Sequence, residues 1–258
     1  MVITESLKSG NEPLYFFGLL SLLGAFVTFI LSLITETKVN GINAFVKPMK
    51  FFISTFFFVW TLGYYCLFLH HQQAVQIFSW ITIIGLGYEL IAITFQAAFG
   101  KLSHYNTSTP FDAAVLFLMV LAIVTVMLAA SFIGILFFIQ VDFDANPVLV
   151  WSIRLSLILT VVFAFEGFVM GYKSGHTIGA SDDTEGLPVV NWSKNHGDLR
   201  IAHFLGLHAI QVVPLLSYFL AKDEITVFII AALYLALTTF TLIRALKGKP
   251  LLGLKRKR

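Results

Sequence analysis

The residues best suited to chemistry stand at the start of the apolar segment 198–220 (DLRIAHFLGLHAIQVVPLLSYFL). Before it becomes purely apolar, this segment contains Asp198, Arg200, His203, His208 and Gln211. A charged side chain near the centre of a bilayer costs at least about a few kcal/mol, so such residues usually mark functional sites. We therefore expect the head of this segment to be the functional centre.

Two acidic residues lie inside other apolar segments. Glu166 stands near the end of segment 148–172, and Glu89 lies within segment 75–99. Glu166 can act as a general base or proton carrier, or it can form an ion pair, and we predict that it pairs with Arg200 directly or through water. Arg200 can instead bind an anionic substrate bidentately or contact a lipid headgroup. Glu89 has no base near it in the sequence, and we expect it to be functional.

Histidine is the other chemically versatile residue type here, since it ligates zinc and haem and transfers protons. His203 and His208 are five residues apart, about 140° around a regular helix, so they cannot both chelate one ion from that helix. We favour a polar pocket without a metal. If a metal is bound, the expected ligand is His203 together with His104, His176 or His196.

Three known membrane classes can be compared with this chain. Segment 225–246 has no lysine for the Schiff base of a retinal protein. Zinc hydrolases of the ceramidase and adiponectin-receptor type use a His-xxx-His pair, whereas His203 and His208 are one residue further apart. Membrane desaturases use that wider spacing in several boxes, and this chain has one. The sequence therefore resembles none of the three closely.

The segments that must position these residues are those of a membrane protein. Of the 258 residues, 58% are hydrophobic and only 12% are charged, about half the charged fraction of a soluble domain. The apolar runs are long enough to span a bilayer as helices. We predict an all-α integral membrane protein, a bundle of about seven transmembrane helices in one domain over residues 1–258. The expected helices lie near 14–34, 44–70, 75–99, 110–139, 148–172, 198–220 and 225–246.

Capping residues and one proline predict where two of these helices begin and where one of them bends. Thr109 and Asp112 form a capping box with Pro110 in the first turn, so we expect Asp112 to be a cap before anything catalytic. Asp198 is the expected N-cap of its helix. Pro214 removes one helical hydrogen bond and should kink that helix past its middle.

Gly85, Glu89, Ala92 and Gln96 recur at helical spacing and form one face of small and polar residues, which we expect to contact protein rather than lipid. On another segment, Gly167 and Gly171 stand four residues apart beside Glu166. A neighbouring helix is expected to approach closely at these two glycines.

Basic residues predict the orientation. With the C-terminus in the cytoplasm, fourteen of the 17 lysines and arginines lie inside and three outside, many of them in the tail 247–258. The N-terminus is then outside. The loop 173–197 is cytoplasmic and is expected to be a lid or a plain connector. A pocket open to the cytoplasm follows, with Glu89 and His208 as its floor and, nearer the surface, Lys50, Gln96, Glu166, Arg200 and His203.

Function is less determined, and three hypotheses stay open. The first is an enzyme acting on a lipid or other amphiphile at the inner leaflet, the second a proton-coupled transporter of a small solute, and the third a sensor or partner subunit. The sequence does not settle whether the protein is an enzyme. The expected catalytic residues are His203, Arg200, Glu166 and Glu89, and the expected substrate-binding residues are Gln96, Lys50, His208, Gln211 and His176.

Partners and location follow from the same features. The expected partners are the lipid bilayer and a lipid or small-molecule ligand, in a multi-pass protein of the plasma (inner) membrane. The net charge of +3 comes largely from the tail and gives no indication of nucleic-acid binding. The identity of any cofactor, the oligomeric state and the substrate are left open. With one cysteine, Cys66, no internal disulfide can form.

Overall fold

The computed structural model describes residues 2–182, 186–187 and 189–251. The chain is 73% helical, with nine helices in this described part. Two pairs of two-residue strands accompany them, β1 (Lys38–Val39) with β2 (Ile42–Asn43) and β3 (Thr177–Ile178) with β4 (Gly197–Asp198). The helices are α1 (Val2–Gly10), α2 (Glu12–Ile34), α3 (Val46–Cys66), α4 (Gln72–Ala98), α5 (Pro110–Ile139), α6 (Pro147–Lys173), α7 (Arg200–Leu207), α8 (Ala209–Leu220) and α9 (Glu224–Leu246).

These helices are those of a membrane protein. In the described residues, α2, α4, α5, α6 and α9 are each long and apolar enough to cross a bilayer, and α7 with α8 makes a sixth span if the bent pair is counted as one. Helix α3 is 21 residues long but falls outside this set, because Lys47, Lys50 and two tyrosines reduce its apolar character. Five to six spans are therefore supported, while the predicted count of seven and the orientation stay predictions.

The chain divides into two compact units, Met1–Asn146 and Pro147–Arg258. The first contains α1 to α5, in which α2 packs against α3 and α4 against α5. The second contains α6 to α9 with β3 and β4, and α6 contacts each of α7, α8 and α9. The single domain expected over residues 1–258 stays a prediction.

Helix α1 was not expected from the sequence, although it is part of the core of the first unit. Leu7 is fully buried and lies above Gly63 of α3. Asn11 follows the helix and is also fully buried. Its Oδ1 accepts the Leu14 N–H at 3.3 Å, which caps α2, and its Nδ2 donates to Ser79 Oγ at 2.9 Å. One buried asparagine thus joins α1, α2 and α4.

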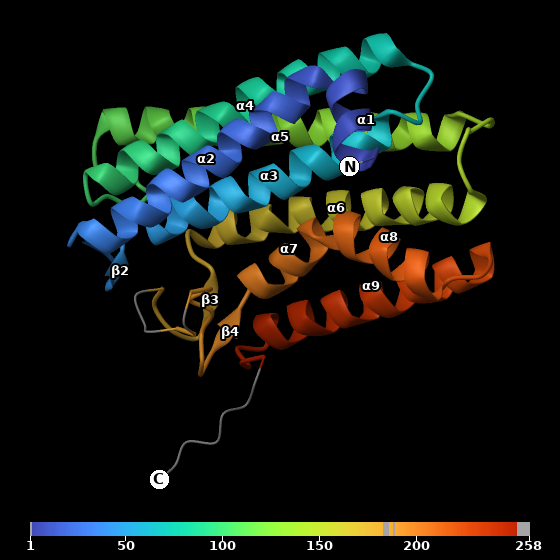
Figure 1. The fold of residues 1–258 in the computed structure, drawn as a ribbon. Coiled ribbons are helices and arrows are strands. Elements are labelled where there is room, and N and C mark those ends of the chain that lie inside the picture. The colour runs from blue at the N-terminus through green and yellow to red at the C-terminus, as the bar shows by residue number, and fades with distance from the viewer. Residues whose placement is uncertain (1, 183–185, 188, 252–258) are drawn as a thin grey trace. The chain divides into compact units, whose positions relative to one another are not determined.

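In the second unit, α6 runs antiparallel to the α7–α8 pair (Figure 1). Two close contacts fix this direction: Gly206 lies against Phe163, and His203, one turn earlier on α7, lies against Gly167, one turn later on α6. A Cβ atom at Gly206 would stand 1.9 Å from the Cβ of Phe163, so only glycine permits this approach. The predicted close packing beside Glu166 is confirmed at Gly167, whereas Gly171 faces open space.

The bend in the α7–α8 pair is not where Pro214 predicts it. The two helices meet at His208 with a bend of 54°, and Pro214 lies inside α8. A side chain from another helix accounts for the position of the break. The hydroxyl of Tyr234 on α9 donates to the Leu205 carbonyl at 2.6 Å, and a regular helix would use that carbonyl to accept from Ala209.

Candidate functional site

The candidate site of the second unit is an acidic residue and a histidine on facing helices. Glu166 lies on α6, its side chain is 6% exposed, and neither of its oxygens has a hydrogen-bond partner among the described residues. The Nδ1 atom of His203 on α7 lies 3.5 Å from Glu166 Oε2. A buried carboxylate without a hydrogen-bond donor is costly as an anion, and a proton or a positively charged imidazole offsets that cost. The pair is therefore suited to holding a proton.

His203 is held in place by the backbone of α6. Its Nδ1 lies 2.8 Å from the Phe163 carbonyl oxygen, and since a carbonyl only accepts, Nδ1 carries the hydrogen. The missing side chain of Gly167 leaves room for the ring, because a Cβ there would be 3.0 Å from the His203 Cε1. The ring is 27% exposed, so it connects the buried Glu166 carboxyl group to the outside of the unit.

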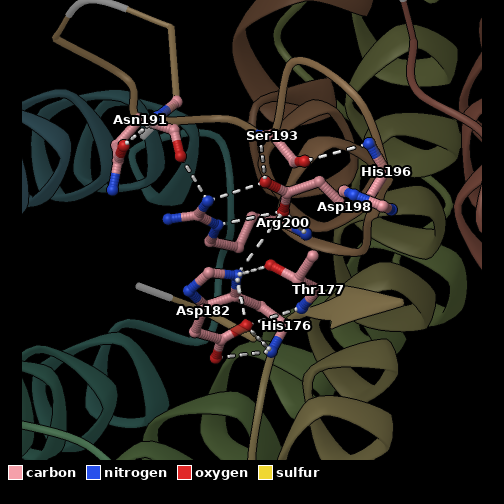
Figure 2. A network of polar contacts seen from close by, with 9 residues as sticks. His176, Thr177, Asp182, Asn191, Ser193, His196, Asp198 and Arg200 are labelled. Atoms are coloured by element: carbon pink, nitrogen blue, oxygen red, sulfur yellow. Dashed lines mark hydrogen bonds and ion pairs between the residues drawn. The ribbon is translucent and has the colours of Figure 1, made fainter. Parts of the chain in front are cut away.

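Arg200 does not pair directly with Glu166, so the predicted direct ion pair is wrong. Its Nε donates to Asp198 Oδ1 at 2.9 Å and one terminal nitrogen donates to Asp198 Oδ2 at 2.6 Å, as Figure 2 shows. The same nitrogen also donates to the Asn191 carbonyl. Asp198 is only two residues from Arg200 in the chain, so the local backbone holds its carboxylate beside the guanidinium, whereas the acid of α6 lies on another helix. With a bidentate partner already bound, Arg200 is a poor candidate for binding an anionic substrate.

Asp198 organises the loop that precedes α7. Its side chain is completely buried, and besides Arg200 it accepts the Ser193 N–H at 2.8 Å. It is not the N-cap residue, which is Leu199, but its Oδ1 accepts the Arg200 N–H at 3.1 Å and so satisfies one donor of the first turn. Gly197 lies so close to the Ala245 carbonyl that a Cβ could not fit, which attaches this part of the loop to the end of α9.

His176 completes this network from the other side (Figure 2). Its Nδ1 lies 3.2 Å from Asp182 Oδ1, 4.0 Å from Asp198 Oδ1 and 3.1 Å from the Thr177 hydroxyl. The backbone N–H groups of His176 and Thr177 also donate to Asp182, at 3.0 and 2.8 Å. His196 takes part through its backbone, which donates to Ser193 Oγ at 3.1 Å. The described part of segment 173–197 is thus a folded connector, and His176 has partners within it.

His208 and Gln211 form a separate group at the bend. The two side chains are 3.2 Å apart between His208 Nδ1 and Gln211 Oε1. The His208 ring packs on Phe204 with 4.4 Å between centroids, and Phe204 in turn meets Trp192 of the connector at 5.6 Å. An aromatic row therefore joins the connector to the bend.

In the first unit, the predicted buried face of α4 is confirmed. Gly85, Glu89, Ala92 and Gln96 are all buried, and Glu89 is 6% exposed.

The N-cap of α5 is Thr109, and Asp112 bonds to it from the first turn of the helix. The Thr109 hydroxyl oxygen accepts the Asp112 N–H at 3.1 Å and the hydroxyl donates back to Asp112 Oδ2 at 2.7 Å. Lys101 adds an ion pair at 3.0 Å, and Gln96 Nε2 donates at 3.3 Å. Gln96 is therefore engaged with the start of α5, although its own Oε1 has no partner among the described residues.

The remaining predicted residues of the first unit lie near the start of α3. Lys47 Nζ is 3.2 Å from His104 Nδ1, and Lys50 is half-buried one turn further along the helix. The predicted common pocket and the predicted His104–His203 ligand pair combine residues of both units, so both stay predictions. Among the described residues, no group of three or more histidines, cysteines and acids is arranged to hold a metal ion.

Comparison with known proteins adds no relative. No protein-family model, no curated protein and no solved structure matches the chain. The function of the site therefore has to be argued from its geometry.

Proposed function

We propose that this protein is a proton-coupled membrane protein, in which the Glu166–His203 pair takes up and releases a proton and so drives the movement of a small solute. One observation carries the proposal: both Glu166 oxygens are buried without a hydrogen-bond partner in the described chain, and Oε2 lies 3.5 Å from the His203 Nδ1. Acidic and histidine side chains inside membrane spans commonly serve as proton relays. The partly exposed His203 is the group that exchanges the proton with the surroundings.

The engagement of Arg200 changes the order of the hypotheses. An enzyme acting on an anionic amphiphile was expected to use Arg200 as its anion-binding group, but the guanidinium is already paired with Asp198. Proton transfer needs only the acid and the histidine, both of which are in place.

The acid–base enzyme is the second candidate, supported by the partial exposure of His203. Incubating the protein with phospholipid vesicles and analysing the lipids would reveal a product that requires His203.

Orientation and the first unit complete the proposal. The fourteen-to-three asymmetry of basic residues, counted for seven spans, favours a cytoplasmic position for the C-terminal end of α6 and for the pair. A reporter fused after Arg258 is then active in the cytoplasm, and activity outside the cell would reverse the orientation. Glu89, which is buried on α4, is proposed as a second proton site. An E89Q protein that behaves like the wild type in the assay below would reduce Glu89 to a structural role.

The test is electrical recording of the full-length protein in vesicles adsorbed on a solid support, without any added solute. A step in pH produces a transient current if protons bind within the membrane. We expect the wild type to give this current and E166Q to lose most of it. The matched control is E224Q, since Glu224 is an exposed acid in the first turn of α9. A current in E166Q as large as in the wild type would contradict the proposal.

A further inference from the structure

The second unit contains two buried hydroxyl groups that break the pattern of the other Ser and Thr side chains. A Ser or Thr in a membrane helix usually donates to a carbonyl of its own helix, which satisfies the hydroxyl. Ser152 and Ser156 on α6 and Thr238 on α9 do so, at 2.7, 2.9 and 2.9 Å. Thr160 on α6 and Ser217 on α8 are 2% and 1% exposed, yet their oxygens have no partner in the described chain.

The two hydroxyls belong to helices that pack against each other. Leu159, next to Thr160, shares an apolar cluster with Val213, one turn before Ser217. Because α6 and α8 are antiparallel, Ser217 lies level with the α6 residues one turn before Leu159, where Ser156 stands. Thr160 and Ser217 are therefore offset by four to five residues, roughly 6 to 8 Å along the helices. Two water molecules, hydrogen-bonded to each other and one to each hydroxyl, fit such an offset.

Buried polar groups that lack a protein partner are commonly satisfied by ordered water. On α6, Thr160 also shares a face with Gly167, seven residues later, on which the His203 ring lies. Glu166 is six residues from Thr160, about 9 Å along the helix axis, a gap that a short chain of water molecules can bridge. The buried Ser156 and Ser152 provide further hydroxyl groups between Thr160 and the N-terminal end of α6.

We propose that the interface between α6 and α8 holds bound water at Thr160 and Ser217, and that this water is the path by which the proton of the Glu166–His203 pair moves along α6. The inference rests on the proposed function of that pair and adds the route, which runs inside the second unit. Ser156 and Ser152 extend the route beyond Ser217. The ligand of this new site is water, and the cargo of the route is a proton.

The first test asks whether water is present. When radicals are generated from water by a short X-ray exposure, buried side chains are oxidised only where bound water lies beside them. We expect Leu159 and Val213 to be oxidised in the wild-type protein and Val227, which is fully buried on α9, to be protected. The double variant T160V/S217A should lose the oxidation at both positions. Protection of Leu159 and Val213 in the wild type would overturn the proposal.

The second test asks whether the water carries protons. In the pH-step recording, T160V and S217A should each slow the transient current about fivefold, the effect of removing one hydrogen bond from the path. T160S keeps the hydroxyl and should match the wild type. T238V removes an equally buried hydroxyl that already has a carbonyl partner, and should also match it. Unchanged currents in T160V and S217A, with loss of the current in E166Q, would overturn the water path alone. A current in E166Q as large as in the wild type would overturn the proposed function.

Discussion

At the scale of single residues, the positive charge of Arg200 is paired with Asp198, an acid close to it in the chain. Glu166 and Arg200 stand at similar depths on neighbouring segments, which suggested an ion pair between them. The structure instead pairs Arg200 with Asp198, two residues before it, and leaves Glu166 to His203. The sequence contained this signal as an Asp-x-Arg spacing at a helix start. The sequence alone could not show that this spacing gives an ion pair, because the loop that folds over Asp198 and buries it is a feature of the tertiary structure.

This pairing predicts that Asp198 is important for stability. The D198N substitution leaves the Arg200 guanidinium without its counter-charge beside a completely buried side chain, so we expect a loss of about 3 kcal/mol. The measurement is thermal unfolding of the purified protein in detergent. D223N serves as the control, since Asp223 is the exposed N-cap of α9 and asparagine caps almost as well. Equal melting shifts for D198N and D223N would show that the Asp198 network contributes little.

At the scale of elements, the apolar segments predicted the long helices within a few residues. The segments near 75–99, 110–139 and 225–246 correspond closely to α4, α5 and α9, because length and hydropathy alone determine a membrane helix. The short elements were missed. Helix α1 is too short to span a membrane and is recognisable only from the burial of Leu7. The strands β1 to β4 are two residues long, below what alternation of side chains can reveal.

The bend at His208 shows the limit of local rules. Pro214 predicted a kink near its own position, but the break lies six residues earlier, where Tyr234 from α9 takes the Leu205 carbonyl. We expect Y234F to destabilise the protein by about 1 kcal/mol, because the freed carbonyl loses its hydrogen bond. Thermal unfolding in detergent measures this loss. Y218F is the control, since Tyr218 is exposed on α8, and a Y234F protein no less stable than Y218F would refute the role given to this hydroxyl.

At the scale of the whole molecule, composition identified a helical membrane protein, and the structure supports five to six spans. The candidate site was predicted only in part. His203 and Glu166 were named from their positions in apolar segments, and the structure brings them together. Their partners were not predictable, because Phe163, Gly167 and Gly206 act through packing between α6 and α7, which no single segment specifies.

The central claim is that Glu166 binds and releases a proton. Infrared difference spectra recorded between neutral and acidic pH detect the C=O stretching band of a protonated carboxylic acid. We predict that acidification of the wild-type protein produces this band for Glu166, that it shifts in D₂O, and that E166Q lacks it while E224Q keeps it. Wild-type and E166Q spectra that superimpose over the whole pH range would contradict the account.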